Sequence, residues 1–108
     1  MKRGELRLVA GGVYASKPRP AVIVQAEWFD SLNSVVVCPV TTTARDAPLL
    51  RVQVGPDRDT GLERVSYIQV DKLTVVRGSN VGALIGVLPH DVQTQLDRLL
   101  LLFLGLAR

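Results

Sequence analysis

The hydrophobic residues of the chain fall into short runs, and glycine, proline and other turn residues interrupt these runs at intervals of about ten residues. In several runs apolar and polar residues alternate, which is the period of a half-buried strand. The pattern predicts strands at residues 6–9, 21–24, 35–40, 50–54, 65–70, 73–76 and 81–88. So many short strands predict a mainly β fold, a twisted antiparallel sheet that curls towards a barrel.

Two of these runs allow a more detailed expectation. Residues 35–40 form a continuous β-prone run, which predicts burial on both faces, with Pro39 near the end of the strand. Residues 50–54 alternate cleanly, so we expect Arg51 and Gln53 to face solvent. Between strands, residues 27–33 are polar with two aromatics and predict a loop or a short helical turn.

In the C-terminal part of the chain the hydrophobic residues recur with a helical period instead of a strand period. Apolar residues at helical spacing predict a helix over 91–103, which Pro89 can precede and Gly105 can cap. Residues 99–104 are all apolar and leave this helix no polar face. Since the core of so small a domain covers one side of a helix, we expect Leu101 or Leu102 to lie in a homodimer interface. The alternatives are a helix sunk in its own core, or a different protein that covers the patch.

Composition is consistent with one folded domain spanning residues 1–108. Hydrophobic residues make up 47% and charged residues 21% of the chain, which is typical of globular proteins. The net charge of +3 is compatible with a polyanionic partner but does not establish one. Glu5 and Arg7 interrupt any signal-peptide core, and the longest apolar run is too short to cross a bilayer. Together with a single cysteine, these features predict a cytoplasmic protein without membrane contact.

Most established catalytic motifs are absent from the sequence. One histidine and one cysteine do not make a set of metal ligands or an intrachain disulfide. The sequence also contains no glycine-rich phosphate loop. We therefore expect no metal and no cofactor. Cys38 lies in the apolar run 35–40 and is interpreted as a buried core thiol. His90 is interpreted as a surface or helix-cap residue.

Two short segments remain as candidate sites. Pro18 and Pro20 stiffen the backbone around Arg19, whose guanidinium presents several donors to a phosphate. Residues 41–43 are three threonines directly after the apolar run 35–40, where their hydroxyls are placed to bind a ligand. Each segment also has an ordinary structural interpretation, an exposed loop arginine in the first case and β-forming or turn residues in the second.

Five segments, in the same order along nearly the whole chain, resemble the MazF/PemK toxins. They are KRGEL at 2–6, RPAVIV at 19–24, VCPVTT at 37–42, GLE at 61–63 with the strand that follows, and IGVL at 85–88 together with LGL at 104–106. Each segment is short, but five segments in the same order as in the family are a specific signal of resemblance.

The resemblance implies a small SH3-like, MazF-type antiparallel β-barrel closed by a C-terminal helix, active as a homodimer. It implies a sequence-specific endoribonuclease toxin that cleaves single-stranded RNA without a metal, leaving a 2′,3′-cyclic phosphate and a 5′-hydroxyl. It also implies a cognate antitoxin whose disordered tail occupies the RNA groove. The family's two catalytic positions, the arginine of Arg-Pro and the threonine after Pro-x, correspond to Arg19 and Thr41.

Such chemistry suits these side chains, because the 2′-hydroxyl of the RNA is the nucleophile. The protein then has to align the phosphate and stabilise the developing charge. As motif neighbours of the pair, four residues are expected to bind RNA: Lys17, Thr42, Arg45 and Lys72.

One feature departs from the family pattern. The stretch between residues 9 and 18 is short, and Tyr14 falls roughly where many members have a glutamate often suggested as the general base. The sequence therefore does not identify the general base, the RNA sequence that is cut or the rate of cleavage. Two other functions also stay open: a non-catalytic toxin of the same fold that poisons DNA gyrase, and an inactive relative that binds RNA or an antitoxin. The presence of both Arg19 and Thr41 favours RNA cleavage over these two.

Overall fold

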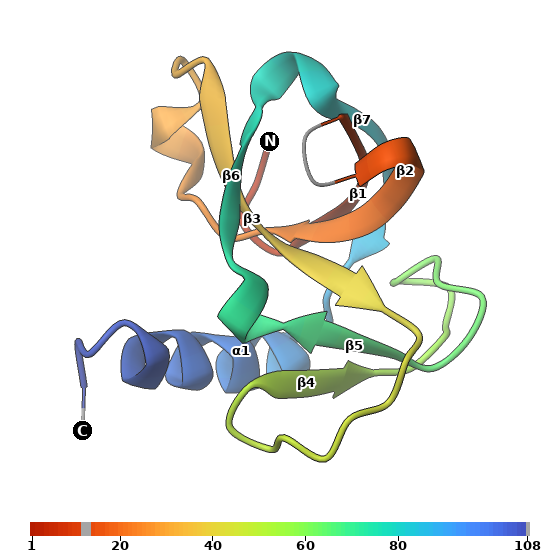
Figure 1. Ribbon diagram of the computed structural model, residues 1–108, viewed down its shortest axis with the longest axis vertical. Helices are drawn as coiled ribbons and strands as arrows, with labels where there is room; N and C mark the ends of the chain where they lie inside the picture. Colours follow the sequence, from red (N-terminus) through yellow and green to blue (C-terminus); the bar gives the residue numbers. More distant parts are fainter. Residues whose placement is uncertain (12–13, 108) are drawn as a thin grey trace.

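The computed structural model describes residues 1–11 and 14–107 and confirms the predicted elements (Figure 1). Strands are connected in three places by short 3-10 turns, which are η1 Glu27–Phe29, η2 Val70–Lys72 and η3 Gly78–Asn80. The last described element is the helix α1 His90–Phe103. The strands are β1 Glu5–Gly11, β2 Tyr14–Ile23, β3 Ser34–Thr41, β4 Arg51–Val54, β5 Ser66–Gln69, β6 Thr74–Arg77 and β7 Val81–Val87.

Strand β3 is the centre of the sheet, because it pairs with three other strands. Its first half, Ser34–Val37, pairs with β6, its last residues Val40 and Thr41 pair with β5, and its other edge pairs with β2. All pairings are antiparallel, in the order β4-β5-β3-β2-β1-β7, with β6 beside β3. Among the described residues this order has two ends, β4 and β7, so the sheet curls like a barrel without closing through strand pairing.

Alternate residues of the central strands feed two hydrophobic clusters. Val22 and Cys38 join the cluster that packs against α1, whereas Ala21, Ile23 and Val37 join a second cluster inside the curl of the sheet. Figure 1 shows this arrangement, with α1 running beneath β4 and β5 and the N-terminus inside the curl above. The predicted burial of β3 on both faces is thereby confirmed.

The expectation that Arg51 faces solvent was wrong. Arg51 is only 8% exposed, because its guanidinium forms an ion pair with Asp71 of η2 and also donates to the carbonyl of Leu50 at 3.0 Å. Gln53 is exposed as predicted. Alternation along a strand says which face a side chain occupies, but a partner on a distant turn decides whether that face is covered.

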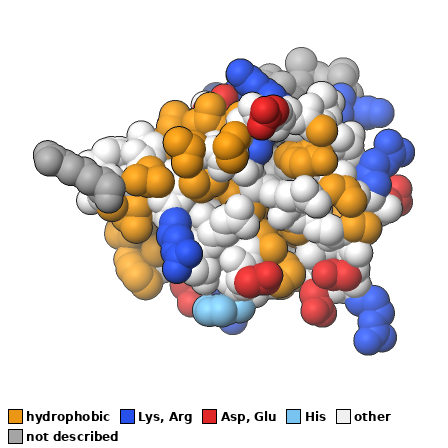
Figure 2. All heavy atoms as spheres, turned by 90° about the horizontal axis from the view of Figure 1, so that it is seen from below, with side chains coloured by type: hydrophobic (Ala, Val, Ile, Leu, Met, Phe, Trp, Pro, Cys, Tyr) orange, Lys and Arg blue, Asp and Glu red, His pale blue; other side chains and the backbone are white. Residues whose placement is uncertain are grey.

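Helix α1 buries one side and exposes the other. Leu96, Leu99 and Leu100 pack into the core, and Gly105 ends the helix in the left-handed conformation (φ +74°), as predicted. The exposed apolar side chains are Leu101, Leu102, Phe103 and Leu104, with 43–51% of each surface accessible. Seen from the helix side, hydrophobic side chains gather towards the C-terminal end (Figure 2). None of the described helices has the length and apolar character needed to cross a membrane.

Candidate functional site

The ladder between β2 and β3 places the two predicted catalytic residues. Ala21 pairs with Pro39, and on one side of this pair lie Arg19, two residues before Ala21, and Thr41, two residues after Pro39. Because side chains alternate across a strand, Arg19 and Thr41 belong to the same face of the sheet. Arg19 is exposed and forms no ion pair within the described residues, and Thr41 is half-buried. The structure thus puts a guanidinium and a hydroxyl on one side of the two strand ends.

The backbone around this pair is ordered by strand pairing and a local hydrogen bond. Arg19 and Pro20 pair with Val9 and Leu8 of β1, so the proline-flanked segment is extended as predicted. At the other strand, the Thr41 hydroxyl accepts a hydrogen bond from the Thr43 amide at 3.1 Å. This bond orients the Thr41 side chain and gives the first turn of the threonine segment a defined shape.

The four predicted RNA-binding residues are all exposed, but they do not gather at one place. Lys17 lies on β2 two residues before Arg19, in the stretch where the β1–β2 register is irregular, and Thr42 directly follows β3. Arg45 lies in the loop between β3 and β4. Lys72 lies on η2, the turn between β5 and β6 that packs against α1. The same turn also contacts β3, the strand that ends at Thr41, so RNA binding by Lys72 stays a prediction.

A groove of about 490 Å³ opens between strands β1, β2 and β7 and the loop before β5. Its lining includes Pro20 and Thr42, which are the sequence neighbours of Arg19 and Thr41. Because side chains alternate along a strand, the groove lies on the opposite face of β2 and β3 from Arg19 and Thr41. Its other lining residues come from three separate parts of the chain: Leu8, Gly61, Leu62, Glu63, Arg64, Ser66 and Ile85. Glu63 and Arg64 carry no sequence signal of a site, because isolated charged residues between strands indicate only solvent exposure.

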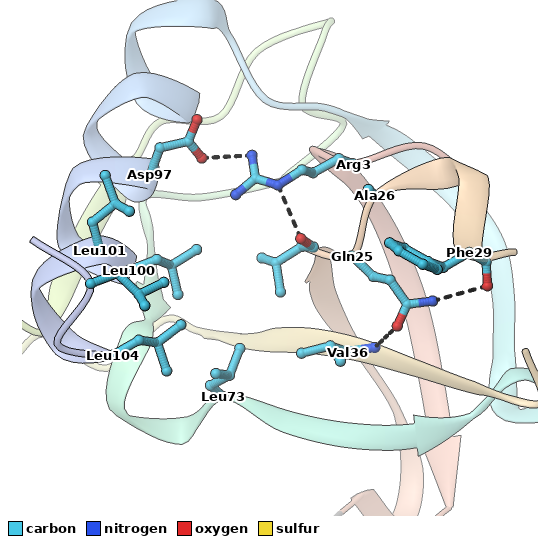
Figure 3. Close-up of a pocket in the computed structure, with 12 residues that line it drawn as sticks. Arg3, Gln25, Ala26, Phe29, Val36, Leu73, Asp97, Leu100, Leu101 and Leu104 are labelled. Atoms are coloured by element: carbon cyan, nitrogen blue, oxygen red, sulfur yellow. Dashed lines mark hydrogen bonds and ion pairs between the residues drawn. The ribbon is translucent and has the colours of Figure 1, made fainter.

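An apolar hollow of about 580 Å³ lies between α1 and the segment after β2 (Figure 3). Leu100 and Leu101 of α1 line it, together with Leu104 just after the helix and Leu73 after η2. Its polar edge is Arg3, whose Nη1 lies 2.6 Å from an Asp97 oxygen and whose Nε donates to the Val24 carbonyl at 3.0 Å. Leu101, one of the two predicted interface residues, lines this hollow, whereas Leu102 is exposed outside it.

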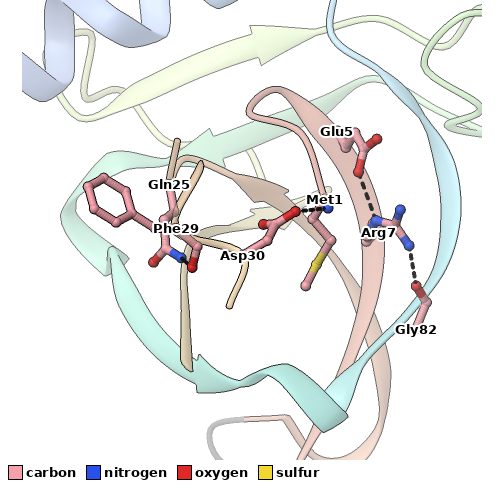
Figure 4. Close-up of polar contacts among 7 residues, drawn as sticks. All are labelled: Met1, Glu5, Arg7, Gln25, Phe29, Asp30 and Gly82. Atoms are coloured by element: carbon pink, nitrogen blue, oxygen red, sulfur yellow. Dashed lines mark hydrogen bonds and ion pairs between the residues drawn. The ribbon is translucent and has the colours of Figure 1, made fainter. Parts of the chain in front are cut away.

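A further set of polar contacts is structural (Figure 4). The Met1 amine pairs with Asp30, and Arg7 bridges Glu5, at 2.9 Å, and the Gly82 carbonyl, at 3.1 Å. Burial acts to raise the pKa of Glu5, but a backbone hydrogen bond at Lys2 and the Arg7 guanidinium together bring it below its ordinary value. These contacts tie β1 to β7 and hold the first residues of the chain beside η1.

Neither Cys38 nor His90 is placed for catalysis. Cys38 is fully buried, as predicted, and burial raises the pKa of its thiol to about 12, so the nucleophilic thiolate does not form near neutral pH. His90 is exposed at the start of α1, also as predicted. In the part of the chain that the structure describes, no three His, Cys, Asp or Glu side chains are grouped so that they could hold a metal ion. The side chain of Tyr14 lies outside the described residues.

Comparison with known proteins gives consistent matches over the whole chain. A family model for PemK-like, MazF-like toxins of type II toxin–antitoxin systems matches residues 2–104. A probable endoribonuclease MazF of Mycolicibacterium smegmatis is 44% identical over 108 residues, which cover 99% of both chains.

Solved structures show the same fold. An endoribonuclease in complex with its cognate antitoxin, from a mycobacterial species, superposes with a TM-score of 0.83 at 24% identity, covering 100% of this chain and 98% of that one. The Mycobacterium tuberculosis toxin MazF-mt6 superposes with a TM-score of 0.81 at 25% identity, covering 96% and 99%. A MazE–MazF structure from Deinococcus radiodurans gives a TM-score of 0.77 at 21% identity, covering 97% and 95%.

Proposed function

The chain belongs to the family of PemK-like, MazF-like toxins of type II toxin–antitoxin systems, and from this premise we propose that it is an endoribonuclease that cleaves single-stranded RNA without a metal ion. The proposal rests on the Ala21–Pro39 pair of β2 and β3, because strand alternation from this pair assigns Arg19 and Thr41 to one face of the sheet. The 44% identity to a probable endoribonuclease supports the same activity. The substrate class is cellular RNA such as mRNA, and the place of action is the cytoplasm.

The proposed reaction is an internal transfer within the RNA. The 2′-hydroxyl attacks the adjacent phosphorus, the bond to the 5′-oxygen of the next nucleotide breaks, and the products carry a 2′,3′-cyclic phosphate and a 5′-hydroxyl. The 2′-hydroxyl gives up its proton and the leaving oxygen gains one, so no water is consumed. No protein group becomes covalently attached, which agrees with a buried, protonated Cys38.

In this reaction the protein has to align the phosphate and stabilise its developing negative charge. The exposed guanidinium of Arg19 supplies a fixed positive charge and several donors for the non-bridging oxygens. The hydroxyl of Thr41 accepts from the Thr43 amide, which leaves its own proton to donate to a phosphoryl oxygen. Lys17, Thr42 and Arg45 are exposed nearby in sequence and are proposed to bind the flanking phosphates and sugars.

Two protein partners belong to the proposal. The first is a second copy of the chain, which would cover the exposed apolar side chains Leu101 and Leu102 of α1. The second is an antitoxin with a disordered tail, in line with relatives whose structures contain their cognate antitoxin. Both partners explain why a small domain retains a contiguous apolar surface at its C-terminal end.

The direct test is incubation of the purified protein with end-labelled single-stranded RNA in EDTA. Fragments that end in a cyclic phosphate and begin with a 5′-hydroxyl support the proposal. An Arg19→Ala protein, prepared in parallel, controls for contaminating ribonucleases. Intact RNA together with inhibited DNA gyrase would instead identify a non-catalytic toxin, and intact RNA with retained binding would identify an inactive relative.

A further inference from the structure

Tyr67 of β5 lies directly opposite Thr41 of β3 in the antiparallel ladder. On its other side, Tyr67 lies directly opposite Gln53 of β4. Residues that oppose each other in this way share a face of the sheet, with their Cβ atoms about 5 Å apart. Thr41, Tyr67 and Gln53 therefore form a row across three strands, on the face to which alternation also assigns Arg19.

The hydrophobic core agrees with this assignment of faces. Three sequence neighbours of the row, Val40, Ile68 and Val52, all belong to the cluster that packs against α1. Since side chains alternate along a strand, the row itself lies on the face that points away from that cluster. Ala21, two residues from Arg19, belongs to the other cluster. Burial and register thus place the aromatic side chain on the same face as the candidate pair.

Tyr67 is both accessible and held in place. The residue is half-buried, and Gln53 beside it is exposed. Trp28 and Phe29 form the only aromatic pair within the described residues, so the Tyr67 ring stacks on no other described ring. Pairing with β3 on one side and β4 on the other fixes its backbone. A tyrosine side chain has only two main torsions, so it binds a ligand at a low cost in conformational entropy.

The surroundings of the ring favour a nucleotide base over a peptide. Proteins bind single-stranded nucleic acid by stacking bases on aromatic side chains while positive groups contact the phosphates. The guanidinium of Arg19 and the hydroxyl of Thr41 on this face are the groups proposed to hold the phosphate. An extended peptide commonly binds by adding to an open strand edge. Strand β5 has no open edge at Tyr67, because both its edges are paired there.

We infer that Tyr67 stacks on the base of a nucleotide next to the phosphate held by Arg19 and Thr41. A ring one strand away from Thr41, at about 5 Å, is within the reach of one nucleotide. This inference rests on the proposed function, and it adds a base-binding residue to that site. Because every base has a π-face, the stack supplies affinity and position rather than a preference for one base.

The test is a double-mutant cycle between Tyr67 and the RNA. An oligonucleotide with a mapped cleavage site carries a 2′-deoxynucleotide at the cut, so it lacks the nucleophile and stays intact. An abasic nucleotide replaces each flanking base in turn. Tyr67→Leu should weaken binding about tenfold, as should the abasic change at one position, on the scale of one base–aromatic stack. The two changes together should weaken binding little further. Tyr67→Phe keeps the ring and should bind like wild type.

A fluorescent base gives a second measurement that a merely structural role of Tyr67 would not affect. The emission of 2-aminopurine falls when this base stacks on an aromatic ring. Placed at the coupled position, it should be quenched by wild type and Tyr67→Phe but not by Tyr67→Leu. Tyr67→Val, whose β-branched side chain suits a strand, also removes the ring, so the test does not depend on the folding of one variant.

The matched control is Trp28→Leu, which removes a 78% exposed aromatic side chain on η1, beyond the opposite end of the β2–β3 ladder. It should bind and quench like wild type. Additive effects of Tyr67→Leu and every abasic change would overturn the inference, as would quenching that persists in Tyr67→Leu. If wild type cleaves no RNA, the proposed function and this inference are both overturned, whereas cleavage without coupling overturns this inference alone.

Discussion

Ala21 of β2 lies directly opposite Pro39 of β3 in the antiparallel ladder. Residues two positions from this pair share its face, so Arg19, two before Ala21, and Thr41, two after Pro39, belong to the same side of the sheet. The β2–β3 ladder ends at this pair, and beyond it Arg19 pairs with β1 and Thr41 with β5 through the other edges of their strands. The guanidinium and the hydroxyl therefore lie at a place where the strand edges are no longer paired with each other.

The first prediction concerns Arg19. Arg19→Ala should lower the rate of RNA cleavage about a hundredfold or more, the scale of losing one preorganised charge donor. The side chain is exposed, so the free energy of unfolding should stay near the wild-type value. Cleavage assays and thermal melts measure the two effects, with the exposed Arg77→Ala as a control. A folded Arg19→Ala protein with wild-type activity would contradict the assignment.

The second prediction concerns the Thr41 hydroxyl. Thr41→Val keeps the β-branched shape and should reduce the cleavage rate strongly. It also removes the acceptor of the Thr43 amide, so a loss of about 1 kcal/mol in stability is expected. Thr43→Val is the matched control, because it changes the side chain but keeps the amide that donates to Thr41. If the control lost activity and Thr41→Val did not, the catalytic threonine would be Thr43.

The third prediction concerns Lys17 and Arg45, which are exposed on β2 and in the loop after β3. If each neutralises one phosphate, the double Ala variant should flatten the slope of log affinity against log salt by about 1.4, at about 0.7 per contact for a single strand. Titration of a non-cleavable RNA at several salt concentrations measures this slope. Lys72→Ala, on η2, reports separately on the fourth predicted contact. An unchanged slope in the double variant would show that neither Lys17 nor Arg45 contacts a phosphate of the RNA.

The fourth prediction concerns the exposed side of α1. Leu101→Glu and Leu102→Glu change side chains that are 43% and 45% accessible, so each chain should still fold but sediment as a monomer. The cleavage rate should fall as well, because the proposed RNA groove needs both subunits. Leu96→Glu puts a charge into the core and should unfold the chain. Leu84→Glu, at an exposed leucine of β7, is the control for an added surface charge.

That prediction fails if the wild-type protein sediments as a monomer at micromolar concentration without an antitoxin. In that case the exposed leucines serve another partner. A dimer that persists in both variants would place the interface on a different surface.

The fifth prediction concerns Cys38. Burial raises the pKa of its thiol from 9.0 to about 12, so the native protein should resist iodoacetamide at pH 8 and react once it is denatured. Above about pH 9 the unfolded chain ionises this thiol while the folded chain does not, so the free energy of unfolding should fall as the pH rises. Chemical denaturation at pH 8 and 10 measures this fall, and Cys38→Ala should show a smaller one. Rapid alkylation of the native protein would show that the thiol is accessible.

The sequence by itself determined the elements and their faces. Alternation or a short apolar run indicated each strand, although β2 begins at Tyr14 rather than at Ala21. The continuous run at 35–40 indicated a strand buried on both sides, as its place between two hydrophobic clusters confirms. The helical spacing after Pro89 placed α1 and its cap at Gly105. These properties depend on the order of neighbouring residues, since the period of a strand or helix is local. Motif order also indicated the family, which the comparisons confirm.

The tertiary structure alone decided which surfaces are covered and which segments meet. Arg51 became buried because Asp71, twenty residues later, supplies a partner. The groove exists because Leu8, Thr42 and Ile85 meet the loop that carries Glu63 and Arg64. Lys72 lies on η2, a turn that packs against both α1 and β3. No local period encodes such meetings, because they depend on how strands cross and curl, and that path is set by packing between residues far apart in the chain.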